Sequence, residues 1–305
     1  MWFNKLTYKV FAGCCGSAFS MELLMQYAPQ SANLITGLQF LFVTIQGFIF
    51  TAKFGTVKPK IPLIKYVYLV GFFFITCFVN NYVYTLHVQT TLHMIIRSAS
   101  TPTSMLVSWL YKKRVPKMTN AIGSILIMIG VATAMYGGVS SVAKQNDGGF
   151  FNWCLGVSFL VTTLFLGAFA GLQQEILFNK YGKHPEEMMF YTHALSVLFF
   201  LPLIPHFKDI SQPLGWHIWG YISLNMVSQF FCTQFVHDLA AKETSVTVTF
   251  ILTIRKFISL IISAIFFEKN LTIYHIVGGL FVFVGTFIYF NFFSSPKRSV
   301  SFKDK

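Results

Sequence analysis

Charged residues are scarce in this chain of 305 residues. They make up 11% of it, whereas an ordinary soluble domain carries about 25%. Hydrophobic residues make up 54%, and 36 residues are Phe. A soluble core cannot hold so much apolar surface without leaving large patches in water, but a bilayer covers such surface with lipid. The shortage of charge therefore argues against a soluble globular domain and predicts an all-α polytopic membrane protein.

Acidic residues are rarer than basic ones. The chain has 10 Asp and Glu against 23 Lys and Arg, which gives a formal net charge of +13. In a soluble protein this excess would indicate a nucleic-acid partner. Here the basic residues lie mainly in short breaks between apolar segments, where they act as topology signals. We therefore expect a lipid bilayer around the chain and no nucleic-acid partner.

Motifs for catalysis and metal binding are also lacking. The chain has no GxSxG, no Walker loop and no HExxH, and no carboxylate pair stands at a spacing typical of acid–base catalysis. Cys14, Cys15, Cys77, Cys154 and Cys232 all lie in apolar stretches and never at CxxC spacing. We expect these cysteines to be small packing residues, with no readable disulfide framework. The sequence thus predicts no enzyme, no metal and no cofactor.

The chain does contain many apolar segments of about 20 residues, the length that spans a bilayer. We predict ten transmembrane helices at about 8–26, 33–51, 62–83, 90–111, 119–139, 153–172, 189–207, 216–237, 244–266 and 272–293. The breaks between them contain Pro, Gly, Lys or Asp.

The distribution of basic residues supports this topology. With a cytosolic N-terminus, 17 of the 23 basic residues fall on the cytosolic side, and Lys144, Lys208 and Lys269 fall on the opposite side. The cytosolic set is Lys5, Lys9, Lys53, Lys58, Lys60, Lys65, Lys112, Lys113, Arg114, Lys117, Lys180, Lys183, Lys242, Lys297, Arg298, Lys303 and Lys305. Such a bias follows the positive-inside rule. It predicts an even number of helices and two cytosolic termini.

The two halves of the chain share a weak repeat. Arg97 and Arg255 each lie in a predicted helix, and the next helix carries two glycines seven residues apart in both cases. Two halves of five helices must be inverted relative to each other, and inverted repeats are typical of secondary transporters. We therefore predict one transport domain with a first repeat at about 1–145, a second at about 146–293 and a short basic cytosolic tail at 294–305.

Ionisable residues inside a bilayer cost several kcal/mol and mark functional sites. Three cations, Arg97, Arg255 and Lys256, lie in predicted helices, against one clearly intramembrane acid, Glu22. This imbalance predicts an electropositive cavity for an anion, with phosphate as the obvious ligand. The alternative is that Glu22 neutralises one cation and that the Ser and Thr residues only hold helices together.

Polar and aromatic residues extend this candidate site. At helical spacing, His93 shares a face with Arg97, and Thr249 and Thr253 share a face with Lys256. Other candidates are Gln39, Asn80 and Asn81 on predicted helices 2 and 3, and Phe190, Tyr191 and His193 on predicted helix 7. An aromatic face beside hydrogen-bonding groups suits a nucleobase. The alternatives are hydrogen bonds between helices and an aromatic belt at the membrane interface.

Seven short segments, in order, carry a resemblance to a known family. They are residues 11–15 (FAGCC), 39–42 (QFLF), 80–82 (NNY), 92–98 (LHMIIRS), 181–184 (YGKH), 190–195 (FYTHAL) and 255–259 (RKFIS). With these segments the chain resembles nucleotide-sugar transporters of the drug/metabolite transporter superfamily over nearly its whole length. The branch that it resembles most carries UDP-N-acetylglucosamine and UDP-xylose.

The resemblance implies ten helices in two inverted repeats and antiport of a cytosolic UDP-sugar against luminal UMP in the Golgi or endoplasmic reticulum. It is compatible with a homodimer. It implies that Phe190 and Tyr191 bind the nucleoside and that Arg255 and Lys256 bind phosphate. Residue 192 is Thr where the family motif has Asn, which shifts the expected base recognition to His193.

The residues combine into one expected site. Lys256, Arg255 and Arg97 are assigned to the phosphates. Tyr191, Phe190, His193, Thr249 and Thr253 are assigned to the nucleoside. Glu22, Gln39, Asn80, Asn81 and His93 are assigned to the sugar or to a gate. Two alternatives stay open: a transporter of another phosphorylated organic anion from the same superfamily, and a multi-pass membrane enzyme that handles lipid-linked sugars.

Overall fold

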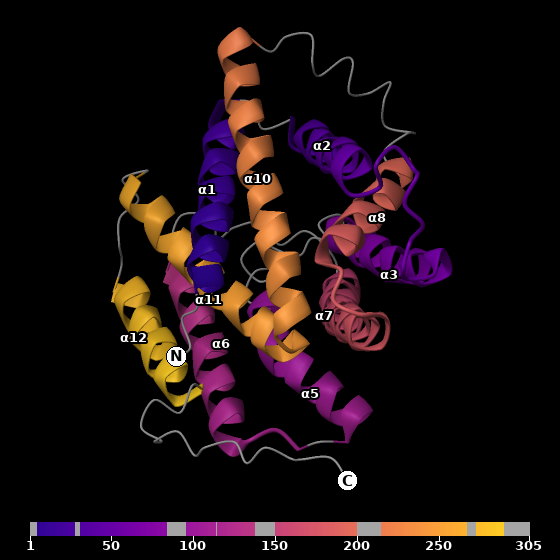
Figure 1. Cartoon of the computed structure of the whole chain (residues 1–305). Helices are drawn as coiled ribbons and strands as arrows, with labels where there is room; N and C mark the ends of the chain where they lie inside the picture. Colours follow the sequence, from indigo (N-terminus) through magenta and orange to yellow (C-terminus); the bar gives the residue numbers. More distant parts are fainter. Residues whose placement is uncertain are drawn as a thin grey trace.

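The computed structural model is built from helices. It describes residues 5–27, 31–83, 96–113, 115–137, 150–199, 215–266 and 273–289. Within these ranges it contains no strand, and its α-helices are α1 (Lys5–Tyr27), α2 (Ala32–Phe50), α3 (Leu63–Tyr82), α5 (Ser100–Lys112), α6 (Met118–Gly137), α7 (Phe150–Tyr181), α8 (Pro185–Val197), α10 (Trp216–Lys242), α11 (Ser245–Phe266) and α12 (Ile273–Tyr289) (Figure 1). The predicted all-α architecture is confirmed for this part of the chain.

Each predicted spanning segment overlaps one of these helices, but their lengths differ. In the described ranges one helix, with its apolar stretch at Cys154–Tyr181, is clearly long and apolar enough to cross a membrane. It runs about nine residues past the predicted end at 172, because nothing breaks the helix before Gly182, whose φ is +96°. Pro185 then begins α8 at its first position. The ten-span topology and the repeat division remain predictions.

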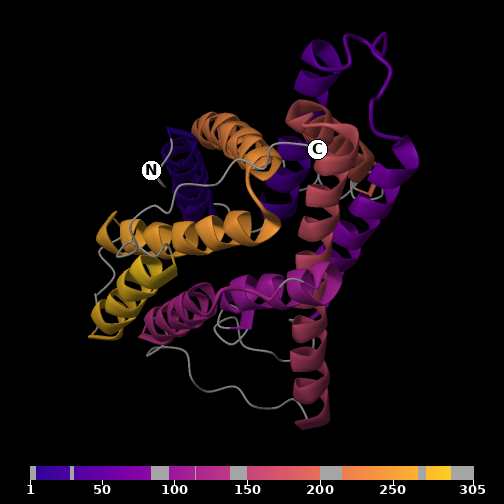
Figure 2. The same ribbon diagram turned by 60° about the horizontal axis from the view of Figure 1, so that its bottom comes forward.

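Helices α6 and α12 pack along each other through paired glycines. A methyl group built on Gly123 would lie 2.7 Å from the carbonyl oxygen of Gly285, and one on Gly130 would lie 2.6 Å from that of Gly278. Figures 1 and 2 both show the two helices side by side. The glycines seven residues apart, noted in each half of the sequence, therefore meet one another and let the two backbones come close.

Helices α1 and α10 also run side by side, and a disulfide joins them. Cys14 and Cys232 are bonded, with a Cα–Cα distance of 4.5 Å and 218 residues between them in sequence. Gly13 allows this approach, because its missing side chain leaves room for the backbone of Cys232. The expectation that all cysteines are packing residues is thus wrong for this pair, whereas Cys15 and Cys154 are free thiols.

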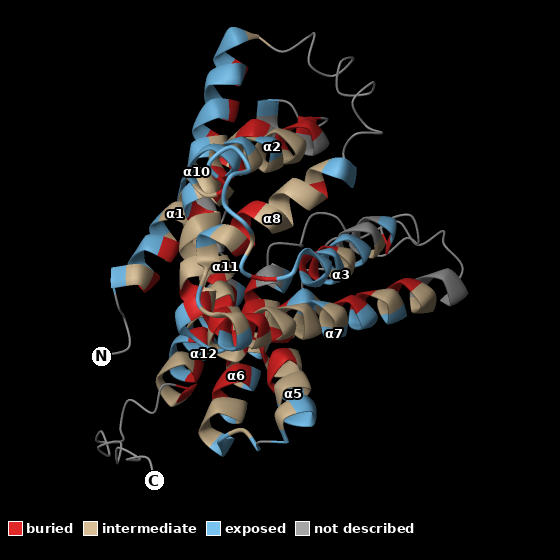
Figure 3. Ribbon diagram, turned by 45° about the vertical axis from the view of Figure 1, so that its right-hand side comes forward, coloured by how far each residue is buried: buried red, intermediate tan, exposed pale blue. Residues whose placement is uncertain are grey.

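Buried residues lie where the helices meet, and many large apolar side chains remain exposed. The largest core cluster draws on α1, α5, α6, α10, α11 and α12 and includes Ile127, Phe250 and Val282. In Figure 3 the buried residues follow the faces between helices. By contrast, Leu280 is 64% exposed and Phe283 is 61% exposed. An exposed apolar surface of this kind suits contact with lipid.

A second cluster joins α3, α7 and α8. Tyr66 is fully buried in it, together with Ile61 and Met188. The Tyr66 hydroxyl donates to the Glu187 carboxylate at 2.9 Å. The same oxygen accepts the backbone N–H groups of Lys60 and Ile61 at 2.9 and 3.0 Å. One carboxylate at the start of α8 thereby fixes the chain that leads into α3.

Candidate functional site

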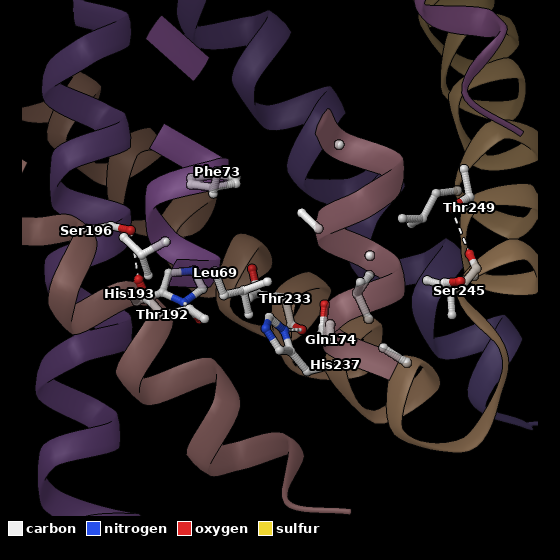
Figure 4. Close-up of a pocket in the computed structure, with 18 of the residues that line it drawn as sticks. Leu69, Phe73, Gln174, Thr192, His193, Ser196, Thr233, His237, Ser245 and Thr249 are labelled. Carbon is white, nitrogen blue, oxygen red and sulfur yellow. Dashed lines mark hydrogen bonds between the residues drawn. The ribbon is translucent and has the colours of Figure 1, made fainter. Parts of the chain in front are cut away.

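A cavity of about 510 Å³ lies between α2, α3, α7, α8, α10 and α11. Its size falls in the range of small-molecule binding sites. Its polar lining consists of Thr36, Gln39, Gln174, Glu175, Thr192, His193, Ser196, Gln229, Thr233, His237, Ser245 and Thr249. Figure 4 shows several of these side chains directed into the space between the helices.

His193 reaches the cavity from the third turn of α8. Its Nδ1 donates to the carbonyl oxygen of Met189 at 2.7 Å, one turn earlier in the helix. The ring of Phe40 on α2 packs edge to face against it, with centroids 5.0 Å apart. The side chain is therefore held from its own helix and from the facing one, and it lines the cavity.

His237 lines the cavity from α10, and the sequence did not single it out. Its Nδ1 donates to the carbonyl oxygen of Thr233 at 2.9 Å. The centroids of the His237 and His193 rings are 6.1 Å apart. Gln174 on α7 lines the same cavity and is labelled with His237 in Figure 4.

Phe190 and Tyr191 lie outside the cavity lining in this structure. Phe190 is buried and faces α2, where a methyl group on Gly47 would meet its ring at 2.6 Å. Tyr191 stacks on Tyr66 with ring centroids 4.9 Å apart. The helical period explains the separation, because residues 192, 193 and 196 occupy the face of α8 that turns toward the cavity.

Gln39 belongs to a polar network between α1, α2 and α10. Its side-chain nitrogen donates to the Asn225 side chain at 2.5 Å. Asn225 is fully buried and donates to Ser20 Oγ at 2.8 Å and to the carbonyl oxygen of Ser17 at 3.0 Å. Ser17 Oγ donates to Gln229, which also lines the cavity, at 2.5 Å. This network supports one wall of the cavity.

Glu175 closes another wall and was missed at the sequence level. It lies beyond the predicted end of its helix, but α7 continues through it. One carboxylate oxygen accepts Lys112 Nζ of α5 at 2.5 Å, and the other accepts the backbone N–H of Ser245 at 2.9 Å. From the sequence alone, Lys112 is expected only to mark the cytosolic side of the membrane. Glu175 thus ties α5 and the N-terminus of α11 to α7, where the helix dipole favours a carboxylate.

The residues of α11 that line the cavity lie on one helix face, and the same face leads to the predicted phosphate site. Ser245, Thr249 and Leu252 line the cavity, and Lys256 follows Leu252 by four residues, so that it lies one turn further on the same face. Arg97 and Arg255 come close enough to repel the Lys256 ammonium. Arg255 Nε is buried without a hydrogen-bond partner among the described residues.

Thr253 serves contact between helices in this structure. It is buried, and its hydroxyl lies 2.9 Å from that of Thr101 on α5 and donates to the carbonyl oxygen of Thr249 at 2.9 Å. Arg97 is largely exposed. Glu22 lies on α1 beyond the Ser17–Ser20 turn and outside the cavity lining.

Three predicted residues lie outside what the structure describes. His93 falls in the gap before residue 96, and nothing is described of the side chains of Asn80 and Asn81. Of the predicted site, the structure therefore brings Gln39, His193 and Thr249 together in one cavity.

Known proteins are similar to this chain in sequence and in fold. A model described as the UAA transporter family matches residues 3–292. The chain is 35% identical over 310 residues to a UDP-xylose and UDP-N-acetylglucosamine transporter of Danio rerio, covering 94% of this chain and 93% of the relative. It is 36% identical over 310 residues to an endoplasmic reticulum GDP-fucose transporter of Drosophila melanogaster, covering 92% of this chain and 88% of the relative.

A protein of known crystal structure, 12% identical in sequence, superposes with a TM-score of 0.68. The match covers 93% of this chain and 94% of the other. At this identity the likeness shows a shared fold alone.

Proposed function

Because the chain belongs to the UAA transporter family, we propose that it is a nucleotide-sugar antiporter. It is a transporter and not an enzyme. It takes UDP-N-acetylglucosamine, UDP-xylose or both from the cytosol into the lumen of the Golgi or endoplasmic reticulum and returns UMP. Two relatives named for these sugars, at 35% and 33% identity over 94% and 95% of the chain, support this substrate class.

The observation that carries the proposal is the cavity between the six helices. It combines aromatic and imidazole rings at α2, α8 and α10 with a face of α11 that leads to Lys256. A nucleoside needs the first kind of surface, and a diphosphate needs the second. The buried, unpartnered Nε of Arg255 supplies a further donor toward an anion.

In the proposed cycle, one site faces the cytosol and the lumen in turn. Arg255 and Lys256 bind the diphosphate, with Arg97 beside them. His193 and Thr249 bind the nucleoside, and Phe190 and Tyr191 of α8 and Thr253 of α11 lie behind this surface. Glu22, Gln39, Asn80, Asn81 and His93 border the sugar or the gate. Exchange for UMP needs no net pumping, because each ligand biases the conformation that it prefers.

The proposed topology is that of a multi-pass membrane protein with ten spans and both termini in the cytosol. A homodimer is compatible with it. Labelling of single cysteines introduced at Lys58 and Lys183, in intact microsomes, checks the side of two loops. The expected result is modification by an impermeant reagent from the cytosolic side. Protection of both until detergent is added would contradict the orientation.

Uptake into proteoliposomes tests the function directly. The purified chain is reconstituted with UMP, GMP or CMP inside, and labelled UDP-, GDP- and CMP-sugars are offered outside. We expect uptake of UDP-sugars that depends on internal UMP. No uptake of any sugar by folded protein would contradict the proposal and leave only a shared fold.

A second candidate is GDP-sugar transport. The observation in its favour is the 36% identity to the Drosophila GDP-fucose transporter. The same panel separates the two, because this candidate requires uptake of GDP-fucose that depends on internal GMP.

A further inference from the structure

Two histidines from different helices lie near each other in the cavity lining. His193 belongs to α8 and His237 to α10, and their ring planes make an angle of 58° at a centroid distance of 6.1 Å. Both are labelled in Figure 4, where the rings approach the same part of the cavity. Within the described residues neither ring forms an ion pair and neither belongs to a group that could hold a metal ion, and the nearest charge acting on His237 is that of Asp238, which follows it in α10.

The backbone fixes the tautomer of both rings. Each Nδ1 lies within hydrogen-bond distance of a carbonyl oxygen one turn earlier, that of Met189 at 2.7 Å and that of Thr233 at 2.9 Å. A carbonyl oxygen only accepts, so each Nδ1 must carry the proton. In a neutral imidazole this leaves Nε2 with a free lone pair. Both histidines therefore offer an acceptor to a ligand.

The neighbouring hydroxyls on α8 reinforce this polarity. Thr192 Oγ1 donates to the carbonyl oxygen of Met188 at 2.7 Å, and Ser196 Oγ donates to that of Thr192 at 2.7 Å. Each hydroxyl has one proton, so what remains toward the cavity is oxygen lone pairs. This end of the cavity is thus rich in acceptors, and it needs a ligand that presents N–H groups.

We propose that His193 and His237 act as paired acceptors that select nucleobases with a ring N–H, namely uracil and guanine, over cytosine and adenine. This inference rests on the proposed nucleotide-sugar function and adds His237 as a specificity-determining residue. At the edge used for base pairing, uracil has N3–H and guanine has N1–H. The corresponding ring nitrogens of cytosine and adenine carry lone pairs, which an acceptor repels.

Other side chains of the cavity can bind the carbonyl groups that flank such an N–H on the base. Gln174 of α7 lines the same cavity (Figure 4), and its amide carries a donor for a carbonyl oxygen of the base. Phe40 holds the His193 ring from α2. A pocket built to hydrogen-bond one edge rejects the analogue that lacks the matching group more strongly than a purely apolar pocket does.

The first test uses the unmodified, full-length protein. Binding of UMP, CMP and 3-methyluridine monophosphate is measured by ligand-induced thermal stabilisation of the purified protein and by competition with UMP exchange in proteoliposomes. We expect UMP to bind at least about tenfold more tightly than either of the other two. Equal binding of UMP and 3-methyluridine monophosphate overturns the acceptor pair without the need for any variant.

The second test assigns the effect to His237. His237→Phe keeps a ring but removes the acceptor, and we expect it to reduce the preference for UMP over CMP by about tenfold. His237→Gln keeps an acceptor oxygen and should retain most of the preference. His217→Phe, an exposed histidine on the same helix, is the matched control and should leave the preference unchanged. An undiminished preference in folded His237→Phe overturns the role of His237.

These outcomes distinguish a failure of the proposed transport function from a failure of the base selection. A wild-type protein that binds and exchanges no nucleotide removes the proposed function and the base selection together. A wild-type protein that exchanges UMP without discriminating among bases keeps the transport function and removes only the acceptor pair.

Discussion

The side chain of Glu187 holds the segment that leads into α3. Its carboxylate accepts from the Tyr66 hydroxyl and from the backbone N–H groups of Lys60 and Ile61. We expect Glu187→Ala to destabilise the protein by about 2–4 kcal/mol, because partly or fully buried donors lose a charged acceptor. The midpoint of thermal unfolding in detergent measures this. Glu186→Ala, an exposed neighbour in the same turn, is the control and should change it little.

Lys256 is the residue whose loss should affect transport most. It continues the cavity face of α11 and lies near two other cations. Lys256→Ala removes a charge-assisted contact to phosphate, so we expect uptake to fall by at least about tenfold, with Lys256→Arg retaining part of it. Initial uptake rates, normalised to folded protein, provide the measurement. Lys242→Ala, at the exposed end of α10, is the control, and normal uptake by Lys256→Ala would contradict the phosphate assignment.

At the scale of elements, the contact of α6 with α12 depends on the absence of side chains. A methyl group on Gly130 or Gly278 would lie 2.5–2.8 Å from backbone atoms of the other helix. We expect Gly130→Ala or Gly278→Ala to cost about 1–3 kcal/mol, because a backbone cannot yield as a side chain does. Gly71→Ala in α3 is the matched control, since its methyl group meets nothing within 4 Å. Thermal midpoints equal to that of this control would contradict the close contact.

The ion pair of Lys112 with Glu175 connects three helices. The two side chains are 28% and 10% exposed, and Glu175 also accepts the first N–H of α11. We expect Glu175→Gln to destabilise the protein more than Lys112→Gln does, because the loss of its charge affects two partners. In a double-mutant cycle the coupling should be about 1–3 kcal/mol. Lys113→Gln, exposed and adjacent, is the control, and a coupling near zero would contradict the connection.

The sequence predicted the all-α architecture because an apolar run of about 20 residues is a local signal. Gln39, His193 and Thr249, selected for their polarity in apolar surroundings, line one cavity in the structure, and their binding roles stay predictions. The sequence missed Glu175 because the helix boundary was drawn too early. It gave no sign that Cys14 and Cys232 meet, because pairing across 218 residues depends on how α1 and α10 pack.

The sequence also did not show which residues of α8 face the cavity. Phe190 and Tyr191 look like base-binding residues by composition, but the structure turns them toward Gly47 and Tyr66. Three-dimensional packing decides which of several neighbouring candidates on one helix faces the cavity.

For the whole molecule, the disulfide between Cys14 and Cys232 should raise stability. It closes a loop of 218 residues, and long loops gain most from a cross-link. We expect Cys14→Ser to lower the free energy of unfolding by about 2–4 kcal/mol, and Cys154→Ser, which removes a free thiol, to have a much smaller effect. Thermal midpoints with and without reductant check this. Absence of the linked peptide pair in a digest of unreduced protein would contradict the bond.

The same bond determines which parts of the protein can move apart during transport. Cys14 comes from the first half of the chain and Cys232 from the second, so α1 and α10 travel as one rigid body in every conformation. The boundary between moving bodies therefore cannot follow the midpoint of the sequence. In the proposed cycle we therefore expect displacement across non-covalent contacts, such as the meeting of α5, α7 and α11 at Glu175, which an ion pair and one backbone hydrogen bond hold together.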